Sequence, residues 1–209
     1  MTNIDTLIDW LRRFQTVVTE KRDWLTELDS AIGDADHGAN MARGMTAVME
    51  KIDAAPPTTA DALFKTTGMT LVSSVGGASG PLYGTFFLRI GTTAGAVAEL
   101  DGAALAAALR AGFDGVVARG KAEPGDKTML DAMAPALDAF DGALADGGDV
   151  AAAAKAAAEA AAKGRDEAKA LVAKKGRASY LGERSADHID PGTASTTLLF
   201  ESLAAAVAE

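Results

Sequence analysis

The sequence predicts an all-α protein of about eight antiparallel helices joined by short turns. Three observations support this fold class. Apolar residues recur at three- and four-residue steps along most of the chain, as one buried face of a helix requires. No stretch shows convincing alternation of apolar and polar residues with β-branched enrichment, which is typical of strands. Glycine, proline and capping residues separate the periodic stretches, and the turns between them are short.

The first half of the chain contains five periodic stretches. The first runs from Ile4 to Leu28, mainly at three- and four-residue steps, and stops at Ile32-Gly33, which indicates one long amphipathic helix. The second ends before Pro56 and Pro57, because proline cannot continue a helix. Thr58 or Thr59 can cap the third. We therefore expect helices at residues 4–32, 41–52, 60–75, 80–90 and 103–118.

Capping residues and apolar periodicity also indicate the helices of the second half of the chain. Asp126 is placed to cap a helix over residues 129–140, and Pro135 should kink that helix or delay its start. Asp149 introduces the alanine-rich stretch 150–173, which could be a linker. Alanine is the strongest helix former, so a helix is favoured there. A last helix is expected at residues 193–207.

One connection is long. Gly176–Gly192, here called the capping loop, exceeds the usual length of a connection in a compact domain, and such loops are usually functional or disordered. The basic segment Lys174–Arg184 overlaps it and contains four cations. Arginine forks suit phosphate oxygens, so we interpret the capping loop as a clamp for a ligand. The alternatives are a floppy connection and a solvated basic face.

The composition excludes several classes of protein. With 209 residues, of which 48% are hydrophobic, the chain can bury one sizeable core, and we expect one domain. A net charge of −9 argues against general binding to nucleic acid or to membrane surfaces, which are themselves anionic. The chain has no cysteine. Asp5 and Asp9 interrupt the first apolar residues, so these do not resemble a signal peptide. No segment is apolar for long enough to span a bilayer, and we expect a cytoplasmic protein.

Three aspartates are candidates for a metal site. Asp34 and Asp36 lie two residues apart in a loop flanked by glycines, and Asp29 ends the preceding helix. If these carboxylates converge, their repulsion favours a bound divalent cation, and hard oxygen ligands suit Mg²⁺ better than zinc. The alternative is that Asp34 and Asp36 are turn and capping residues. The spacing alone slightly favours that alternative.

Two neighbouring segments could bind an anion. His37-Gly38-Ala39-Asn40 opens a helix, and the N–H groups at a helix N-terminus can bind phosphate. For His37 itself, contact with a nucleotide is favoured over metal binding or proton transfer. The glycine-rich turn 76–84 allows either close approach to a ligand or tight helix packing. Residues 115–122 nearly match a P-loop, but Ala122 replaces the required Ser or Thr and a helix precedes it.

Four motifs together resemble the ADP-binding L subunits of phosphoenolpyruvate-dependent dihydroxyacetone kinases, and the resemblance runs through essentially the whole chain. These motifs are Ile32–Gly38, Gly76–Phe87, Gly120–Met129 and Lys175–Ser185.

The resemblance implies an eight-helix antiparallel up-and-down barrel, with the nucleotide at one rim under the capping loop. Residues 1–209 would form a single nucleotide-binding domain. Asp29, Asp34 and Asp36 would hold two Mg²⁺ ions, and ADP or ATP would stay bound as a cofactor. No side chain would act as a covalent catalyst. The nucleotide-binding positions that it implies are His37, Gly38, Ala39, Asn40, Ala78, Ser79, Gly120, Met129, Arg177, Asp190 and Gly192.

The resemblance also implies partners. A phosphocarrier M subunit would recharge ADP to ATP in place, and a K subunit would present dihydroxyacetone for phosphorylation. Two other functions remain open: the nucleotide domain of an ATP-dependent dihydroxyacetone kinase, and a regulatory module whose nucleotide state is read by a transcriptional regulator. A homodimer within the complex is also left open.

Overall fold

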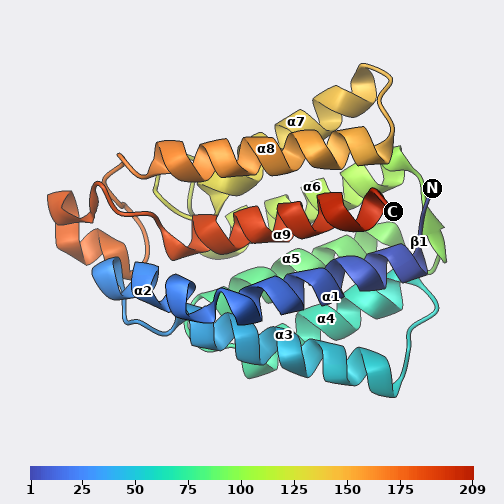
Figure 1. Ribbon diagram of the computed structural model, residues 1–209, viewed down its shortest axis with the longest axis horizontal. Coiled ribbons are helices and arrows are strands. Elements are labelled where there is room, and N and C mark those ends of the chain that lie inside the picture. Colours follow the sequence, from blue (N-terminus) through green and yellow to red (C-terminus); the bar gives the residue numbers. More distant parts are fainter.

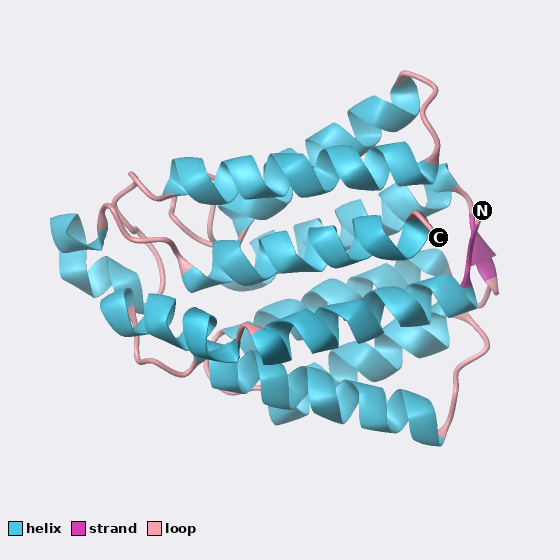
Figure 2. Cartoon of the chain, viewed as in Figure 1, coloured by secondary structure: helices cyan, strands magenta, loops and turns pink.

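The computed structural model describes residues 1–209, and helices dominate it (Figure 1, Figure 2). A pair of two-residue strands, β1 (Thr2–Asn3) and β2 (Glu99–Leu100), joins the N-terminus to the turn before α6. The helices are α1 (Ile4–Glu20), α2 (Arg22–Ile32), α3 (His37–Ala54), α4 (Ala60–Ser74), α5 (Ser79–Ala94), α6 (Gly102–Gly120), α7 (Leu130–Ala145), α8 (Val150–Ala168), the 3-10 helix η1 (Arg177–Ser185) and α9 (Pro191–Val207).

Eight of the helices form a closed ring. Helix α1 packs on α3, and each later helix from α3 to α9 packs on the next, until α9 packs back on α1. Helix α2 stands outside this ring and lies across α3 and α9. The predicted all-α fold of eight antiparallel helices is therefore confirmed, with α2 as an additional helix at one end. A cluster of 43 buried residues fills the ring.

Aromatic side chains occupy the middle of this core. The ring of Trp10 packs edge-on against Phe64 at 5.9 Å and tilted against Phe87 at 6.1 Å. The indole N–H of Trp10 donates to the carbonyl of Leu199 at 2.9 Å. Burying an indole requires such a partner, because an unpaired polar group in the core is costly. These contacts tie α1 to α4, α5 and α9.

The prediction of one long first helix is wrong at Lys21. The backbone there leaves the helical region (ψ 14°), and the chain divides into α1 and α2. Both helices keep an apolar face, with Val18 buried at the end of α1 and Leu25 buried in α2. Val18 and Leu25 are seven residues apart and so keep the same helical phase across the break. Although Lys21 and Arg22 between them are charged, the apolar pattern therefore predicts one helix.

Other element boundaries differ for local reasons. Asp149 caps α8 as expected, accepting from the N–H of Ala152 at 2.8 Å. Asp126 does not cap α7: its carboxylate accepts from the N–H of Glu123, and α7 begins later, at Leu130. Pro135 lies within α7, so the expected delay of the helix start beyond this proline does not occur. Helix α8 ends at Ala168, five residues before the expected end at Ala173.

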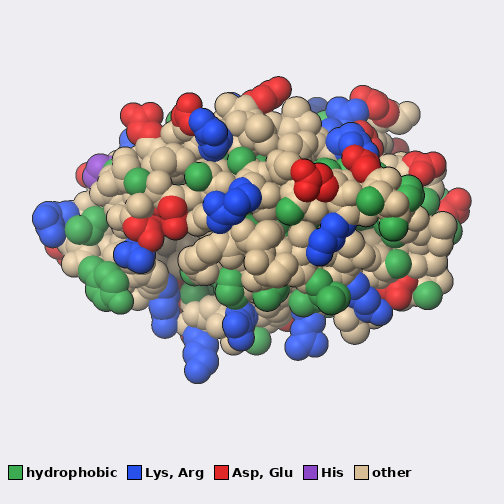
Figure 3. Space-filling model, turned by 90° about the horizontal axis from the view of Figure 1, so that it is seen from below, with side chains coloured by type: hydrophobic (Ala, Val, Ile, Leu, Met, Phe, Trp, Pro, Cys, Tyr) green, Lys and Arg blue, Asp and Glu red, His purple; other side chains and the backbone are tan.

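The two ends of the molecule differ. Both chain termini lie at the end that carries β1, whereas α2 and η1 lie at the opposite end (Figure 1). The capping loop is largely ordered as η1, with a break at Gly182, where φ is 54°. Basic and acidic side chains are interspersed over the face shown in Figure 3. None of the helices is both long and apolar enough to cross a membrane.

Candidate functional site

A cavity of about 520 Å³ opens at the end of the barrel that carries α2 and η1. Its walls come from the C-terminal ends of α2 and α6, the N-terminal ends of α3, α5, α7 and α9, and the start of η1. Pockets for small molecules commonly have volumes of about 300–1,000 Å³. Four helix N-termini surround this cavity, and their dipoles favour an anionic ligand.

The three predicted metal ligands converge on one side of this cavity. One ligand oxygen from each of Asp29, Asp34 and Asp36 lies within 4.8 Å of the others. The buried Asp29 holds the loop together, because its Oδ2 accepts from the N–H of Asp36 at 2.8 Å and from that of His37 at 3.0 Å. A Cβ on Gly33 would lie only 2.0 Å from Asp29 Oδ1, so the loop needs glycine there.

This donor set fits a divalent cation. Three hard carboxylate oxygens are the ligands that Mg²⁺ prefers, and one or two carboxylates together with ligand phosphates are a common arrangement. Asp34 also forms a salt bridge with Arg177 of the capping loop, Nε to Oδ2, at 2.9 Å. The arginine thus brings positive charge directly to the aspartate cluster. A divalent cation bound to the aspartates would therefore lie next to an anion bound to the basic segment.

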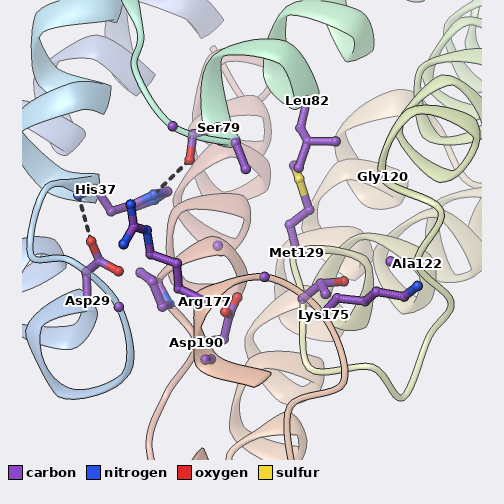
Figure 4. Close-up of a pocket in the computed structure, with 18 of the residues that line it drawn as sticks. Asp29, His37, Ser79, Leu82, Gly120, Ala122, Met129, Lys175, Arg177 and Asp190 are labelled. Atoms are coloured by element: carbon purple, nitrogen blue, oxygen red, sulfur yellow. Dashed lines mark hydrogen bonds between the residues drawn. The ribbon is translucent and has the colours of Figure 1, made fainter. Parts of the chain in front are cut away.

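Both ring nitrogens of His37 lie within hydrogen-bonding distance of serine hydroxyls, and Figure 4 shows the contact with Ser79. Nδ1 lies 3.0 Å from Ser79 Oγ, and Nε2 lies 2.9 Å from Ser195 Oγ. Burial lowers the pKa of His37 to about 4, although the charge of Asp29 partly opposes this shift. The imidazole is therefore neutral near pH 7, and it links the start of α3 to the starts of α5 and α9.

Sequence reasoning missed the other members of this network. The Tyr83 hydroxyl lies 2.7 Å from Ser195 Oγ and 3.1 Å from Thr196 Oγ1. Burial raises the pKa of Tyr83 to about 12, so the phenol keeps its proton. A signal was available, because Thr193–Thr197 places four hydroxyl residues close together at the start of a largely apolar helix. These hydroxyl groups indicate that the start of this helix contacts polar side chains of other helices.

The other side of the cavity is apolar. Met129, Leu82, Gly120 and Ala122 all line the cavity, and in Figure 4 they are seen on the opposite side from Asp29, His37 and Ser79. Val116 completes this wall. A ligand that combines a flat apolar group with an anionic group would match both sides. Of the lining residues here, sequence reasoning singled out Met129 and Gly120 but not Leu82 or Val116.

Asp190 occupies the floor of the cavity at the start of α9. Its Oδ2 accepts from the N–H of Thr193 at 2.8 Å and so caps the helix. Burial raises the pKa of Asp190 to about 7, and the nearby charge of Asp131 raises it further, although the bond from Thr193 and the charge of Lys127 act in the opposite direction. The carboxyl group is thus close to half-protonated at neutral pH.

Asp131 organises the loop that carries Met129. Its carboxylate accepts from the backbone N–H of Thr128 at 2.8 Å and from that of Gly125. Like Asp126, it bonds to N–H groups of the turn before α7, and neither aspartate is the helix cap that the sequence predicted at Asp126. The structure thereby fixes the position of the Met129 backbone at the entry to α7.

Most of the predicted site residues line the cavity, and three do not. The exceptions are consecutive. Gly38 packs against α2, where a Cβ would lie 2.0 Å from the carbonyl oxygen of Arg22. Ala39 is exposed, and Asn40 is buried and accepts from Arg43 at 2.6 Å. The lining positions are Asp29, Asp34, Asp36, His37, Ala78, Ser79, Gly120, Met129, Arg177, Asp190 and Gly192.

Comparison with known families gives a match to the DAK2 domain over residues 31–205. The chain belongs to the DAK2 domain family. This match confirms the resemblance drawn from the four sequence motifs, all of which lie within the matched residues.

Two relatives of this DAK2 chain match it over nearly its full length. The ADP-binding subunit DhaL of the PEP-dependent dihydroxyacetone kinase of Escherichia coli (strain K12) is 44% identical over 203 residues, which cover 97% of each chain. The ADP-binding subunit DhaL of the PTS-dependent dihydroxyacetone kinase of Lactococcus lactis is 44% identical over 208 residues and the full length of both chains.

Longer proteins match as well. The L-erythrulose 1-kinase of Mycolicibacterium smegmatis is 36% identical over 92% of this chain, which corresponds to 34% of the kinase. A crystal structure of the dihydroxyacetone kinase of C. freundii superposes with a TM-score of 0.74 and 27% identity over 95% of this chain. A second, in complex with AMP-PNP and Mg²⁺, superposes with a TM-score of 0.72. The DAK2 chain spans about a third of these solved chains.

Proposed function

We propose that this chain is the nucleotide-binding subunit of a phosphoenolpyruvate-dependent dihydroxyacetone kinase. It would hold Mg-ADP as a cofactor, be recharged to Mg-ATP by a phosphocarrier M subunit, and pass the phosphoryl group to dihydroxyacetone on a K subunit. The observation that carries the proposal is the convergence of Asp29, Asp34 and Asp36 on a cavity whose opposite wall is apolar.

The two sides of the cavity match the two ends of a nucleotide. Asp29, Asp34 and Asp36 would hold Mg²⁺, in one or two ions, against the phosphates. Arg177 and the helix N-termini would bind the remaining phosphate oxygens. The purine would pack against the apolar wall that contains Leu82 and Met129, since apolar side chains pack well on a flat aromatic ring. Gly38, Ala39 and Asn40 would then contribute mainly by fixing the start of α3.

The chemistry needs no covalent protein intermediate. In-line phosphoryl transfer depends on positioning and on stabilising charge at the transferred group. The metal supplies charge neutralisation and orients the phosphates when it is bound. The chain itself contributes the neutral His37, the cationic Arg177 and the dipoles of four helix starts, all of which surround the polar half of the cavity.

Sequence identity favours the subunit over the nucleotide domain of an ATP-dependent kinase. The chain is 44% identical to two separate ADP-binding subunits and 36% identical to the matching part of the L-erythrulose 1-kinase. The ATP-dependent alternative is tested by activity with a K subunit and dihydroxyacetone. The proposal expects turnover with phosphoenolpyruvate and carrier proteins, whereas rapid multiple turnover with ATP alone would assign the chain to the ATP-dependent group.

Calorimetry with Mg-ADP tests the nucleotide site directly. Asp34→Ala should weaken binding by at least tenfold, because it removes one of three carboxylates and the partner of Arg177. Asp53→Ala is the matched control, since Asp53 is an exposed aspartate on α3 that also pairs with an arginine, Arg12, and does not line the cavity. Equal affinity for wild type and Asp34→Ala, or no binding by the wild type, would refute the site.

A further inference from the structure

Lys127 is a buried lysine that the proposed chemistry does not use. Its side chain is only 1% exposed, although lysine is almost never fully buried without partners. The residue also has a left-handed backbone (φ 61°), a conformation that costs about 1 kcal/mol or more outside glycine. Both features indicate that the surroundings hold this residue in one arrangement.

The partners of the Lys127 ammonium are three backbone carbonyls. Nζ donates to the carbonyl oxygens of Lys169 and Leu171, each at 2.8 Å, and to that of Ser185 at 2.7 Å. An ammonium has three N–H donors, so its hydrogen-bonding capacity is fully used. Hydrogen bonds from a charged donor are stronger than neutral ones, and this difference grows away from water.

These carbonyls come from both sides of the basic segment Lys174–Arg184. Lys169 and Leu171 precede the segment, and Ser185 follows it directly. One ammonium therefore joins the two ends of this loop. A second link lies beside it, because the N–H of Ala173 donates to Ser185 Oγ at 2.8 Å. The basic segment is thus closed at its base by polar contacts.

Few apolar contacts hold the basic segment otherwise. Ala178 belongs to a cluster of three buried residues that is separate from the main core. Tyr180 is 87% exposed. The other ties are polar. Arg177, whose side chain is 67% exposed, forms the salt bridge with Asp34, and Lys174 contacts Asp126 through a salt bridge at 3.7 Å and through its backbone N–H, which donates to the Asp126 carbonyl at 3.0 Å. A loop with so little buried apolar surface depends on its polar anchors for a fixed position.

We propose that Lys127 is a positioning residue that holds the basic segment over the cavity and thereby sets Arg177 against the aspartate cluster. Lys127 lies two residues before Met129 in the same turn. It therefore connects the apolar wall of the cavity to the arginine on the polar side. This role rests on the proposed nucleotide site, because it assigns the basic segment held by Lys127 to the binding of the nucleotide.

Hydrogen exchange measured without nucleotide tests whether Lys127 holds the basic segment in a fixed position. Lys127→Met keeps the aliphatic stem and removes the three donors, and we expect amides of residues 172–186 to exchange at least tenfold faster while those of α5 keep their rates. Lys163→Met is the control, because Lys163 is a 76% exposed lysine on α8. Unchanged exchange in the loop, or equal acceleration in all helices, overturns the proposal. If Lys127→Met does not fold, Lys127→Gln is measured instead, and wild-type exchange in that variant overturns it equally.

A double-mutant cycle then tests the connection to Arg177. Lys127→Met and Arg177→Ala should each raise the dissociation constant for Mg-ADP about tenfold or more. If Lys127 acts by placing Arg177, the double variant should be weakened by clearly less than the product of the two effects. A double variant that shows the full product overturns the connection. A wild-type chain that binds no Mg-ADP would refute the proposed function instead. The exchange experiment would still test whether Lys127 holds the basic segment in place.

Discussion

Gly38 offers a sharp test of how this site is built, because the structure assigns it to helix packing rather than to the cavity. In Gly38→Ala the new Cβ would lie 2.0 Å from the carbonyl oxygen of Arg22 and 2.6 Å from Thr26 Oγ1, whereas ordinary contacts begin near 3.4 Å. The backbone of α2 cannot rotate away as a side chain could. Helices α2 and α3 would have to move apart by about 1 Å.

Such overpacking typically costs about 1–3 kcal/mol of unfolding free energy. For a chain of this size, each kcal/mol lowers Tm by roughly 2–4 °C, so a loss of several degrees is expected in thermal unfolding followed by circular dichroism. The movement would also separate Asp29 on α2 from the His37 N–H that it accepts at 3.0 Å. Mg-ADP affinity, measured by calorimetry, should therefore fall together with stability.

Gly142→Ala is the matched control. Gly142 is exposed in α7, and nothing lies within 4 Å of the Cβ that alanine would add. Alanine is the better helix former, so this change should raise stability by about 0.5–1 kcal/mol and leave nucleotide affinity unchanged. A Gly38→Ala variant with the Tm of the wild type or higher would refute the packing argument. Weaker binding without lost stability would instead indicate that Gly38 contacts the ligand.

Two further expectations concern aspartates of the cavity. Because the pKa of Asp190 rises from 3.8 to about 7, the folded chain holds a proton that the unfolded chain has lost, and the unfolding free energy from Asp190 should decline as pH rises from 4 to 7. At about 1.4 kcal/mol per pKa unit the decline is at most about 4 kcal/mol. The lowered pKa of His37 has the opposite effect on the unfolding free energy, so the pH dependence of the wild type alone does not isolate Asp190. The test therefore compares the wild type with Asp190→Asn by urea unfolding at several pH values. Parallel plots of unfolding free energy against pH would contradict the raised pKa of Asp190. Asp131→Ala should cost about 1.5–3 kcal/mol, since two backbone N–H groups lose a charged acceptor, and a Tm within 2 °C of the wild type would show that they find other partners.

Much of the fold followed from local patterns. Helix periodicity, capping residues and proline positions located the helices of the barrel to within a few residues, because these signals depend on neighbours one or two turns away. The break at Lys21 escaped this reasoning, since Val18 and Leu25 on either side of it are seven residues apart and keep the same helical phase. The cap predicted at Asp126 is wrong for a different reason. An aspartate before a helix suits a cap or a turn by composition, and only the actual path of the turn shows that Asp126 accepts from the N–H of Glu123 and Asp131 from that of Thr128.

The sequence by itself determined the helical architecture, the family and the three carboxylates, whose roles the spacing alone left open. The tertiary structure decided which of those residues meet. Asp29, Asp34 and Asp36 converge because α2 leaves the barrel and turns back at Gly33. The partners of His37 and Lys127 lie far away along the chain, in α9 and beside the basic segment. Such contacts depend on the angles and distances at which whole helices pack, and no local pattern of residues contains that information.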